Sequence, residues 1–390
     1  MVTLTSADNA LKSVYLEVLQ NQLNTGVNPF LAKIKNSTKD VWGKEVIKLA
    51  PLGINGGISA GTETGDLPDA TGNNYLKFVS TLKNLYGSIS ITDKAIRASA
   101  NNAGAFVNLL NDEMEGLLKA ATFNFGRMLY GDGSGLLGAL SAVDTTNLCF
   151  TTGNIQNYIE GQVVDLVNTN GTETVTVKAV DRAGGKVYIK EAAFTGTYVD
   201  NGDFVATNAY AADSKDNELT GLGKIFDTSS SIYGVTRTNL YALLPEIDSS
   251  TTTLTEVAMQ KLIDDSELKC GTSIDFIACS PAVRRKYQGV LATNKQLVNT
   301  IDLAGGVKAL SFNGIPVVAD RFCPAKTMFF LDSKTFCIHQ LCDWRWLEGD
   351  SGKILKQNAG KATYNATLVK YAEMICDVPG GQAKFSNITE

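Results

Sequence analysis

The only histidine, His339, limits the chemistry that this sequence could perform. A Ser-His-Asp or Cys-His hydrolase would have to be built on it, and no pattern nearby supplies a nucleophile. Cys337, His339 and Cys342 form the run CIHQLC, and with Cys323 they would give four zinc ligands. Their spacing matches no paired C-x-x-C arrangement, and on a strand Cys337 and His339 share one face with Leu341. The pattern therefore favours an interior strand over a metal site.

Two further patterns resemble sites but lack the context that such sites require. Residues 133–138, GSGLLG, fit G-x-G-x-x-G, yet they follow a helix instead of a strand and hold no lysine for a phosphate loop. We interpret them as a helix terminator and a turn. Asp264, Asp265 and Glu267 lie together, but on an amphipathic helix such acids usually form a solvated face. The sequence thus predicts no catalytic residue, no cofactor and no bound metal, and we expect a protein that is not an enzyme.

The composition is that of a globular chain long enough for two or three domains. Its 390 residues are 44% hydrophobic, and the net charge of -5 disfavours a surface that as a whole binds nucleic acid. The first residues do not resemble a signal peptide, and no apolar run reaches the ~18 residues that span a bilayer, so we expect a cytosolic protein without a membrane. Seven scattered cysteines are typical of reduced core residues: Cys149, Cys270, Cys279, Cys323, Cys337, Cys342 and Cys376.

The stretch 101–137 predicts one long amphipathic helix around which the chain is organised. Apolar residues recur along it at steps of three and four: Phe106, Leu110, Met114, Leu117, Ala121, Phe125 and Met128. With a cap at Asn102 and the glycines after Tyr130 as its end, the helix covers about 28 residues and roughly 42 Å. Charged residues lie off this stripe, so we expect a second face that is solvated or meets a neighbour: Asp112, Glu113, Glu115, Lys119 and Arg127.

The N-terminal part predicts a short helix, an arm and a projecting loop. Residues 6–23 form an amphipathic pattern, and residues 25–38 are mostly polar, which indicates an extended arm crossing a surface. Residues 46–49 predict a strand, and a second strand system returns at 75–91. Between them, residues 51–72 hold six glycines and two prolines. A loop of this length is usually functional, so we expect a glycine-tipped hairpin that is presented to another chain.

The middle of the chain predicts an inserted β module. From 158 to 206 β-branched residues alternate with polar ones, and Asn170-Gly171, Gly184-Gly185 and Asn201-Gly202 are candidate hairpin turns. These features indicate a small antiparallel barrel or sandwich. Residues 141–153, between the long helix and this module, are expected to be a connector.

The C-terminal half predicts an α/β domain followed by a strand-rich segment, 336–388. Helices are expected where the period is near 3.6, and strands where short apolar runs are bounded by turn residues. The expected helices are 255–268 and 281–291, and the expected strands include 275–279, 317–318 and 328–331.

Three stretches of the sequence resemble the major capsid proteins of tailed bacteriophages. They are YLKFVSTLKNLYGSISITDKAIRAS, GAFVNLLNDEMEGLLKAATFNFGRMLYGDGSGLLG and FNGIPVVADRFCPAKTMFFLD. The resemblance spans most of residues 25–375 and is strongest over 67–138. It implies an α+β chain with the Hong Kong 97-type fold and an inserted small antiparallel β domain. The implied parts are an N-terminal arm at 1–38, an extended loop at 39–84, a peripheral domain with the spine helix at 85–150 and 341–390, the inserted β domain at 151–208, and an axial domain at 209–340.

The resemblance also implies a structural function. The chain would be a major capsid, or head, protein that self-assembles into pentamers and hexamers of an icosahedral virion shell around double-stranded DNA, held by confinement. Expected partners are copies of the chain and scaffold, portal and decoration proteins, with assembly in the cytoplasm of the bacterial host. The alternative is a non-capsid surface or tail β-rich structural protein. Apolar residues expected at the subunit interface are Leu67, Tyr75, Phe78, Trp344 and Trp346.

Overall fold

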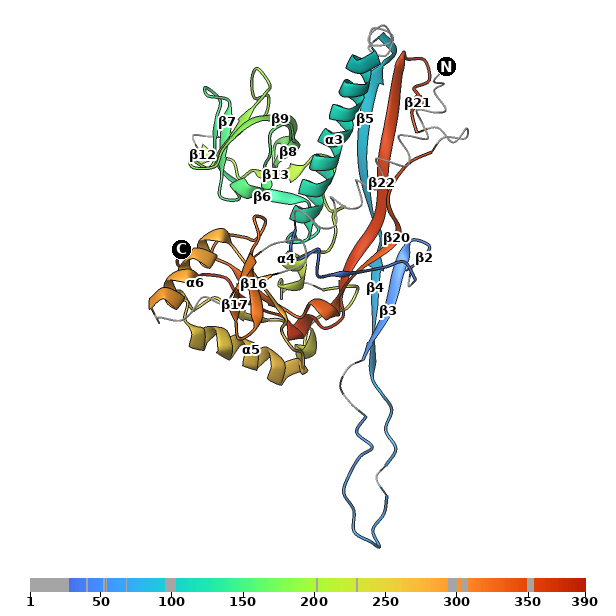
Figure 1. Cartoon of the computed structure of the whole chain (residues 1–390), viewed down its shortest axis with the longest axis vertical. Helices are drawn as coiled ribbons and strands as arrows, with labels where there is room; N and C mark the ends of the chain where they lie inside the picture. Colours follow the sequence, from blue (N-terminus) through green and yellow to red (C-terminus); the bar gives the residue numbers. More distant parts are fainter. Residues whose placement is uncertain are drawn as a thin grey trace.

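A computed structural model shows an elongated molecule with a central body, two attached lobes and one long projecting hairpin (Figure 1). The structure describes residues 28–39, 41–51, 53, 55–67, 69–94, 103–200, 203–228, 231–293, 300–302, 308–348 and 354–390. The predicted helix at 6–23, the first 27 residues of the arm, the cap at Asn102 and the turn Asn201-Gly202 lie outside these residues. Among the described helices, none combines the length and apolarity needed to cross a membrane.

The peripheral part of the body is a long helix lying along a narrow sheet (Figure 1). The helix α3 spans Ala103–Met128, two residues shorter than the roughly 28 expected. It packs on β5, where Gly87 permits close contact, because a Cβ there would come within 2.8 Å of Leu117. The sheet runs β1-β20-β22-β21, with β5 also paired to β22. Its strands are β1 (Lys35–Ser37), β5 (Lys83–Thr92), β20 (Phe336–Trp346), β21 (Lys356–Gln357) and β22 (Thr363–Cys376).

The predicted stripe of α3 is buried or half-buried where its side chains are described, and the opposite face is only partly open. Met114, Phe125 and Met128 are buried, while Glu113, Glu115 and Lys119 are exposed. The side chains of Phe106, Leu110 and Asp112 lie outside the described set. The prediction for Arg127 is wrong, because the last turn of the helix is buried and the Arg127 guanidinium is paired inside the protein.

The sequence predicts that the segment 28–38 is an arm lying over a surface, and this prediction is wrong. Phe30 is buried among rings of three other parts of the chain, with centroids 5.3 Å from Phe336, 6.1 Å from Tyr130 and 6.2 Å from Phe276. Asn28 accepts hydrogen bonds from the backbone N–H groups of Phe30 and of Leu31, which fixes the turn. The correction has a simple cause: one large ring embedded in the core outweighs the polar residues around it.

The projecting hairpin has the predicted position and form. Strands β3 (Glu45–Pro51) and β4 (Tyr75–Thr81) are antiparallel from the pair Glu45–Thr81 to the pair Pro51–Tyr75, and β2 (Val41–Trp42) extends this small sheet. The loop beyond the last pair extends away from the body (Figure 1). Nearly all of its described side chains are exposed.

The inserted module is a closed antiparallel barrel of six strands, in the order β10-β7-β6-β13-β8-β9. The expected connector at 141–153 is wrong, because β6 begins directly after the glycine turn that ends α3. Strand β6 was missed since small residues and a bulge near Leu140 interrupt its alternation. The module therefore occupies 136–211 instead of 151–208. Its strands are β6 (Leu136–Asp144), β7 (Cys149–Thr152), β8 (Val163–Asn168), β9 (Gly171–Asp181), β10 (Lys186–Ile189) and β13 (Asn208–Ala211), with the short hairpin β11 (Val199–Asp200) and β12 (Asp203–Phe204).

The axial part is a seven-stranded mixed sheet in the order β14-β23-β19-β15-β18-β17-β16. Residues of β15 alternate between two cores: Phe276 and Ala278 face the body, while Ile277 and Cys279 face a layer formed by α5 and α6. Both faces are covered, which explains the continuous apolar run. The elements are α4 (Leu222–Ile225), β14 (Glu246–Asp248), α5 (Glu256–Cys270), β15 (Phe276–Cys279), α6 (Pro281–Thr293), β16 (Thr300–Asp302), β17 (Lys308–Phe312), β18 (Ile315–Ala319), β19 (Met328–Leu331) and β23 (Ala383–Phe385).

The expected C-terminal segment of the peripheral domain, 341–390, differs from the structure at both of its ends. The boundary at 340–341 would cut β20, all of which belongs to the peripheral sheet. The C-terminal strand β23 pairs with β14 and β19 of the axial sheet, so residues after Cys376 return to the axial part. Sequence order alone did not indicate this return, because β23 pairs with strands that lie about 55 and 137 positions earlier in the chain.

Candidate functional site

His339, the residue considered for catalysis, lies in the interior of the peripheral sheet. His339 is fully buried on β20, directly opposite Glu373 of β22. Burial raises the pKa of the Glu373 carboxyl to about 7, while the backbone N–H of Thr220 donates a hydrogen bond to it at 2.8 Å. A bulge after Gln340 leaves Leu341 exposed, so it does not share the face expected for it. His339 and Glu373 therefore lie inside a sheet and are both fully buried.

The possible zinc ligands are not brought together. The Cys323 thiol donates a hydrogen bond to the carbonyl oxygen of Thr327, and burial raises its pKa. Within the described ranges, no group of three or more His, Cys, Asp or Glu side chains is placed to hold a metal ion. All seven cysteines lie in described residues and are free thiols, as predicted.

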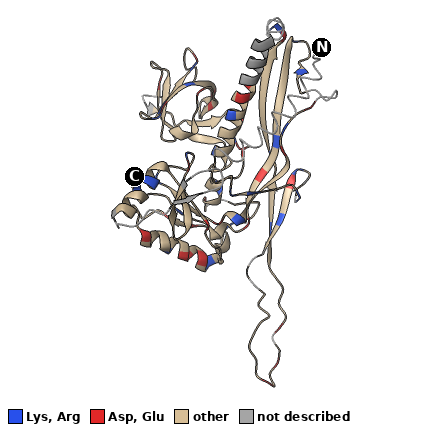
Figure 2. Ribbon diagram, in the orientation of Figure 1, with Lys and Arg blue, Asp and Glu red and all other residues tan. Residues whose placement is uncertain are grey.

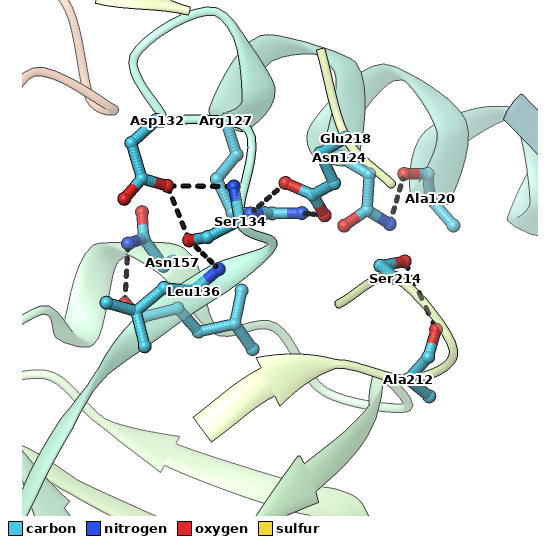
Figure 3. Close-up of polar contacts among 11 residues, drawn as sticks. Ala120, Asn124, Arg127, Asp132, Ser134, Leu136, Asn157, Ala212, Ser214 and Glu218 are labelled. Atoms are coloured by element: carbon cyan, nitrogen blue, oxygen red, sulfur yellow. Dashed lines mark hydrogen bonds and ion pairs between the residues drawn. The ribbon is translucent and has the colours of Figure 1, made fainter. Parts of the chain in front are cut away.

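Residues 133–135 of the glycine motif lie in the turn between α3 and the barrel, as predicted, whereas residues 136–138 already belong to β6. The carboxylate of Asp132 accepts a hydrogen bond from the backbone N–H of Ser134 at 3.0 Å (Figure 3). Gly135 has φ +78°, and a Cβ there would lie 2.6 Å from the carbonyl oxygen of Ser214. Only glycine tolerates both conditions, so the motif is explained by backbone geometry without a ligand.

A buried ion pair lies at this same junction. The Arg127 guanidinium at the end of α3 forms a bidentate ion pair with the Glu218 carboxylate, with one N–O distance of 2.9 Å (Figure 3). Both side chains are almost fully enclosed, at 3% and 2% exposure. Three backbone hydrogen bonds run beside it, from the N–H groups of Ala211, Asp216 and Glu218 to the chain entering the barrel. The barrel is therefore attached through two antiparallel segments that are hydrogen-bonded to each other.

The projecting hairpin packs on the body only at its base, and the rest of the chain leaves its outer part uncovered. Val46 and Phe78 point inward, and the Phe78 ring lies 5.4 Å from that of Tyr233. The Lys48 ammonium pairs with the carboxylate of Asp377 at 2.6 Å, which fixes the base of the hairpin to the body. Beyond this base, the described loop residues contribute nothing to the three hydrophobic cores.

The expected interface residues divide into two groups. Leu67 and Tyr75 are open, at 90% and 58% exposure. Phe78, Trp344 and Trp346 are buried in their own subunit, so the expectation that they contact a neighbour is not supported by their position. The reason is that an aromatic side chain suits a core as well as an interface, and sequence alone does not distinguish the two. Trp344, for example, packs its ring 6.3 Å from that of Phe125.

Sequence reasoning missed other exposed apolar residues of the hairpin. Ile47 and Leu49 lie on the outer face of β3, and Ile58 lies in the loop, all largely exposed. The run VIKLA was a usable signal, because it places apolar residues on both faces of one strand. A strand with two apolar faces is expected to be covered on both, and here the chain itself covers only one.

The arrangement defines the Hong Kong 97-type capsid fold predicted from the resemblance: a spine helix along a narrow sheet, an axial α/β lobe and an extended hairpin. The chain is similar to a chain of the Cyanophage A-1(L) capsid asymmetric unit, with a TM-score of 0.57, 12% identity and 94% of each chain covered. At this identity the likeness shows the fold alone.

Two further structures give weaker matches. The chain from Mycobacterium phage Adephagia has a TM-score of 0.46 and 10% identity over 97% of this chain and 92% of that one. The capsid of Myoviridae phage XM1 gives 0.46 and 11% over 93% and 92%. The fold assignment rests on the cyanophage chain. No protein-family profile and no curated protein matches the sequence.

Proposed function

We propose that this chain is a major capsid protein, which assembles into pentamers and hexamers of the icosahedral shell of a tailed phage. The observation that carries the proposal is the projecting hairpin in a chain with the capsid fold. Its base is bonded firmly to the body, whereas its outer face and its loop leave apolar side chains open. Such a feature has a physical purpose only if another chain covers it.

The physical requirements of a shell fit this reading. One chain must make heterologous contacts that close into rings and must tolerate slightly different angles between neighbours. Buried apolar area contributes about 25 cal/mol per Å2 before the costs of association, so several modest overlaps per subunit hold a shell together. A glycine-rich loop supplies contact area that adapts to the angle, while the bonded hairpin base sets its direction.

The proposal includes a set of partners and a location. The main partner is the chain itself, and scaffold, portal and decoration proteins are further expected partners in the host cytoplasm and the virion. Packaged double-stranded DNA would be held by confinement, which suits a chain of net charge -5. The role is structural and not enzymatic, which the interior position of His339 supports.

Electron microscopy of the purified recombinant chain, alone and with a scaffold encoded beside it, tests the proposal. Closed shells or capsomers with five and six subunits are the expected result. Fibres or tubes that never close would favour a tail protein instead, and monomers under every condition would contradict assembly altogether. Sedimentation of the same samples measures the assembled fraction independently.

A further inference from the structure

Two helices of the axial part present side chains of opposite charge to solvent. Acidic residues gather along α5, and basic residues gather along α6 at another edge of the same lobe (Figure 2). Both helices cover the same core on one face of the axial sheet. The charges are therefore displayed by one rigid layer, whose helices are positioned by their buried sides.

The face of α5 combines acids with exposed apolar residues. Asp264 and Glu267 are exposed, and neither takes part in a salt bridge among the described residues. Val257 and Leu268 are 80% and 86% exposed, although Met259 on the opposite side of the helix is fully buried. The helix also carries two lysines, but Lys261 pairs with Asp265 and Lys269 pairs with Glu246, so the charges left unpaired on this face are acidic. Together with two open aliphatic side chains, these acids are suited to a basic protein surface.

The face of α6 has the complementary character. Arg284, Arg285 and Lys286 follow one another, and the helix contains no acidic residue. Val283 and Tyr287 on either side of this run are buried, while Arg285 and Lys286 are exposed and Arg284 is half-buried. Across the described part of the chain, no salt bridge involves any of the three.

We propose that the α5 face of one copy docks against the α6 face of the next copy around a ring. A head-to-tail ring requires two different, complementary surfaces on one chain, and these two helices supply them. Charges at such a contact steer association and set its polarity, because like faces repel while unlike faces attract. This inference rests on the proposed capsid function and names the surfaces that would form the capsomer centre.

Charge reversal on each face separately is the first half of the test. Arg285→Glu with Lys286→Glu makes both faces acidic, and Asp264→Lys with Glu267→Lys makes both basic. Each double variant is expected to assemble at least about tenfold more slowly than the unchanged chain at low salt. Lys178→Glu with Lys190→Glu, at two exposed positions of the barrel, is the matched control and should assemble normally. Circular dichroism and thermal melting confirm that each variant folds.

The combination of the two reversals is the second half. A chain carrying all four substitutions has its faces exchanged, keeps the original net charge and should recover assembly to within about threefold of the unchanged chain. An equal mixture of the two double variants should also recover rings, but only with alternating subunits. A ring of six can alternate and a ring of five cannot, so hexamers without closed shells are expected from the mixture.

The outcomes separate this inference from the function on which it rests. If the unchanged chain never assembles, the capsid function fails. If it assembles and both double variants do so equally well, the docking of α5 on α6 is overturned. The docking is likewise overturned if the four-substitution chain stays defective, or if the α6 reversal lowers only the DNA content of otherwise normal shells.

Discussion

The projecting loop and the inserted barrel both extend from the same body, but the barrel has a hydrophobic core of its own and the loop has none. The barrel closes six strands around its own core, in which Phe150, Tyr158 and Val164 are fully buried. The loop between β3 and β4 contributes no described residue to any core, and its internal order consists of a few hydrogen bonds such as that from Asn55 to Thr71. The barrel is therefore expected to be stable by itself, whereas the loop depends on contacts outside its subunit.

Shortening the loop is the change with the largest expected effect. Replacing residues 52–74 by Asn-Gly closes β3 and β4 with a two-residue hairpin turn. The subunit should keep its melting temperature, because nothing in its cores is removed, but shells should be lost entirely in sedimentation and electron microscopy. Thr62→Ser with Thr64→Ser retains the length of the loop and serves as the control. Normal shells from the shortened chain would remove the basis of the comparison.

A cavity in the barrel tests the claim that the barrel is stable by itself. Phe150→Ala removes a fully buried ring and should lower the free energy of unfolding of the barrel by about 3 to 5 kcal/mol. Hydrogen exchange should show faster opening in 136–211 and little change in the peripheral sheet. Val163→Ala, at a partly exposed position of the same barrel, should have a much smaller effect. Equal loss of protection in barrel and body would show that the barrel is not independent.

The ion pair at the junction tests how firmly the barrel is attached. Arg127→Met leaves the Glu218 carboxylate buried without its partner, which should destabilise the subunit by about 3 kcal/mol in chemical denaturation. The double variant Arg127→Met with Glu218→Leu removes both charges and should recover most of that loss. A double variant as unstable as the sum of the single ones would indicate that packing, and not the stranded charge, dominates.

The smallest effect on stability is expected from a buried acid in the body. Its titration tests the body separately from the loop and the barrel. Burial raises the pKa of the Asp320 carboxyl to about 6 in the folded protein, where the Tyr130 hydroxyl donates a hydrogen bond to it. Because the folded pKa lies above the unfolded value, its contribution to stability is present at low pH and is lost as pH rises from about 4 to about 6.

Asp320→Asn should remove this pH dependence, which amounts to on the order of 2 kcal/mol across that window. Denaturation of both proteins at a series of pH values measures the difference, and other acids cancel in the comparison. Parallel curves for the two proteins would contradict the assignment to Asp320.

The elements that could be predicted are those whose periodicity is local. The helices α3, α5 and α6 follow apolar stripes, and the hairpin turns of the barrel follow Asn-Gly and Gly-Gly pairs. What could not be predicted depends on residues distant in sequence. Arg127 pairs with Glu218 across 91 positions, and β23 joins a sheet formed mostly by earlier residues.

The exposed residues of the projecting hairpin show the same limit of prediction from the sequence. Hydrophobicity identified Leu67 and Tyr75 together with Phe78, but only the fold decides which side of the hairpin each occupies. The strand residues Ile47 and Leu49 were assigned only to a strand, without a prediction of which of its faces is exposed. Exposure of that second face is a property of tertiary structure.

Single-particle electron microscopy of assembled particles tests the central claim, that this chain acts by contacting copies of itself, most directly. The account predicts closed particles in which the loop of each subunit lies over a neighbouring subunit. That neighbour covers Ile47, Leu49 and Leu67 of the projecting hairpin. A loop folded back on its own subunit in the particle, or a chain that stays monomeric with every candidate scaffold, would contradict it.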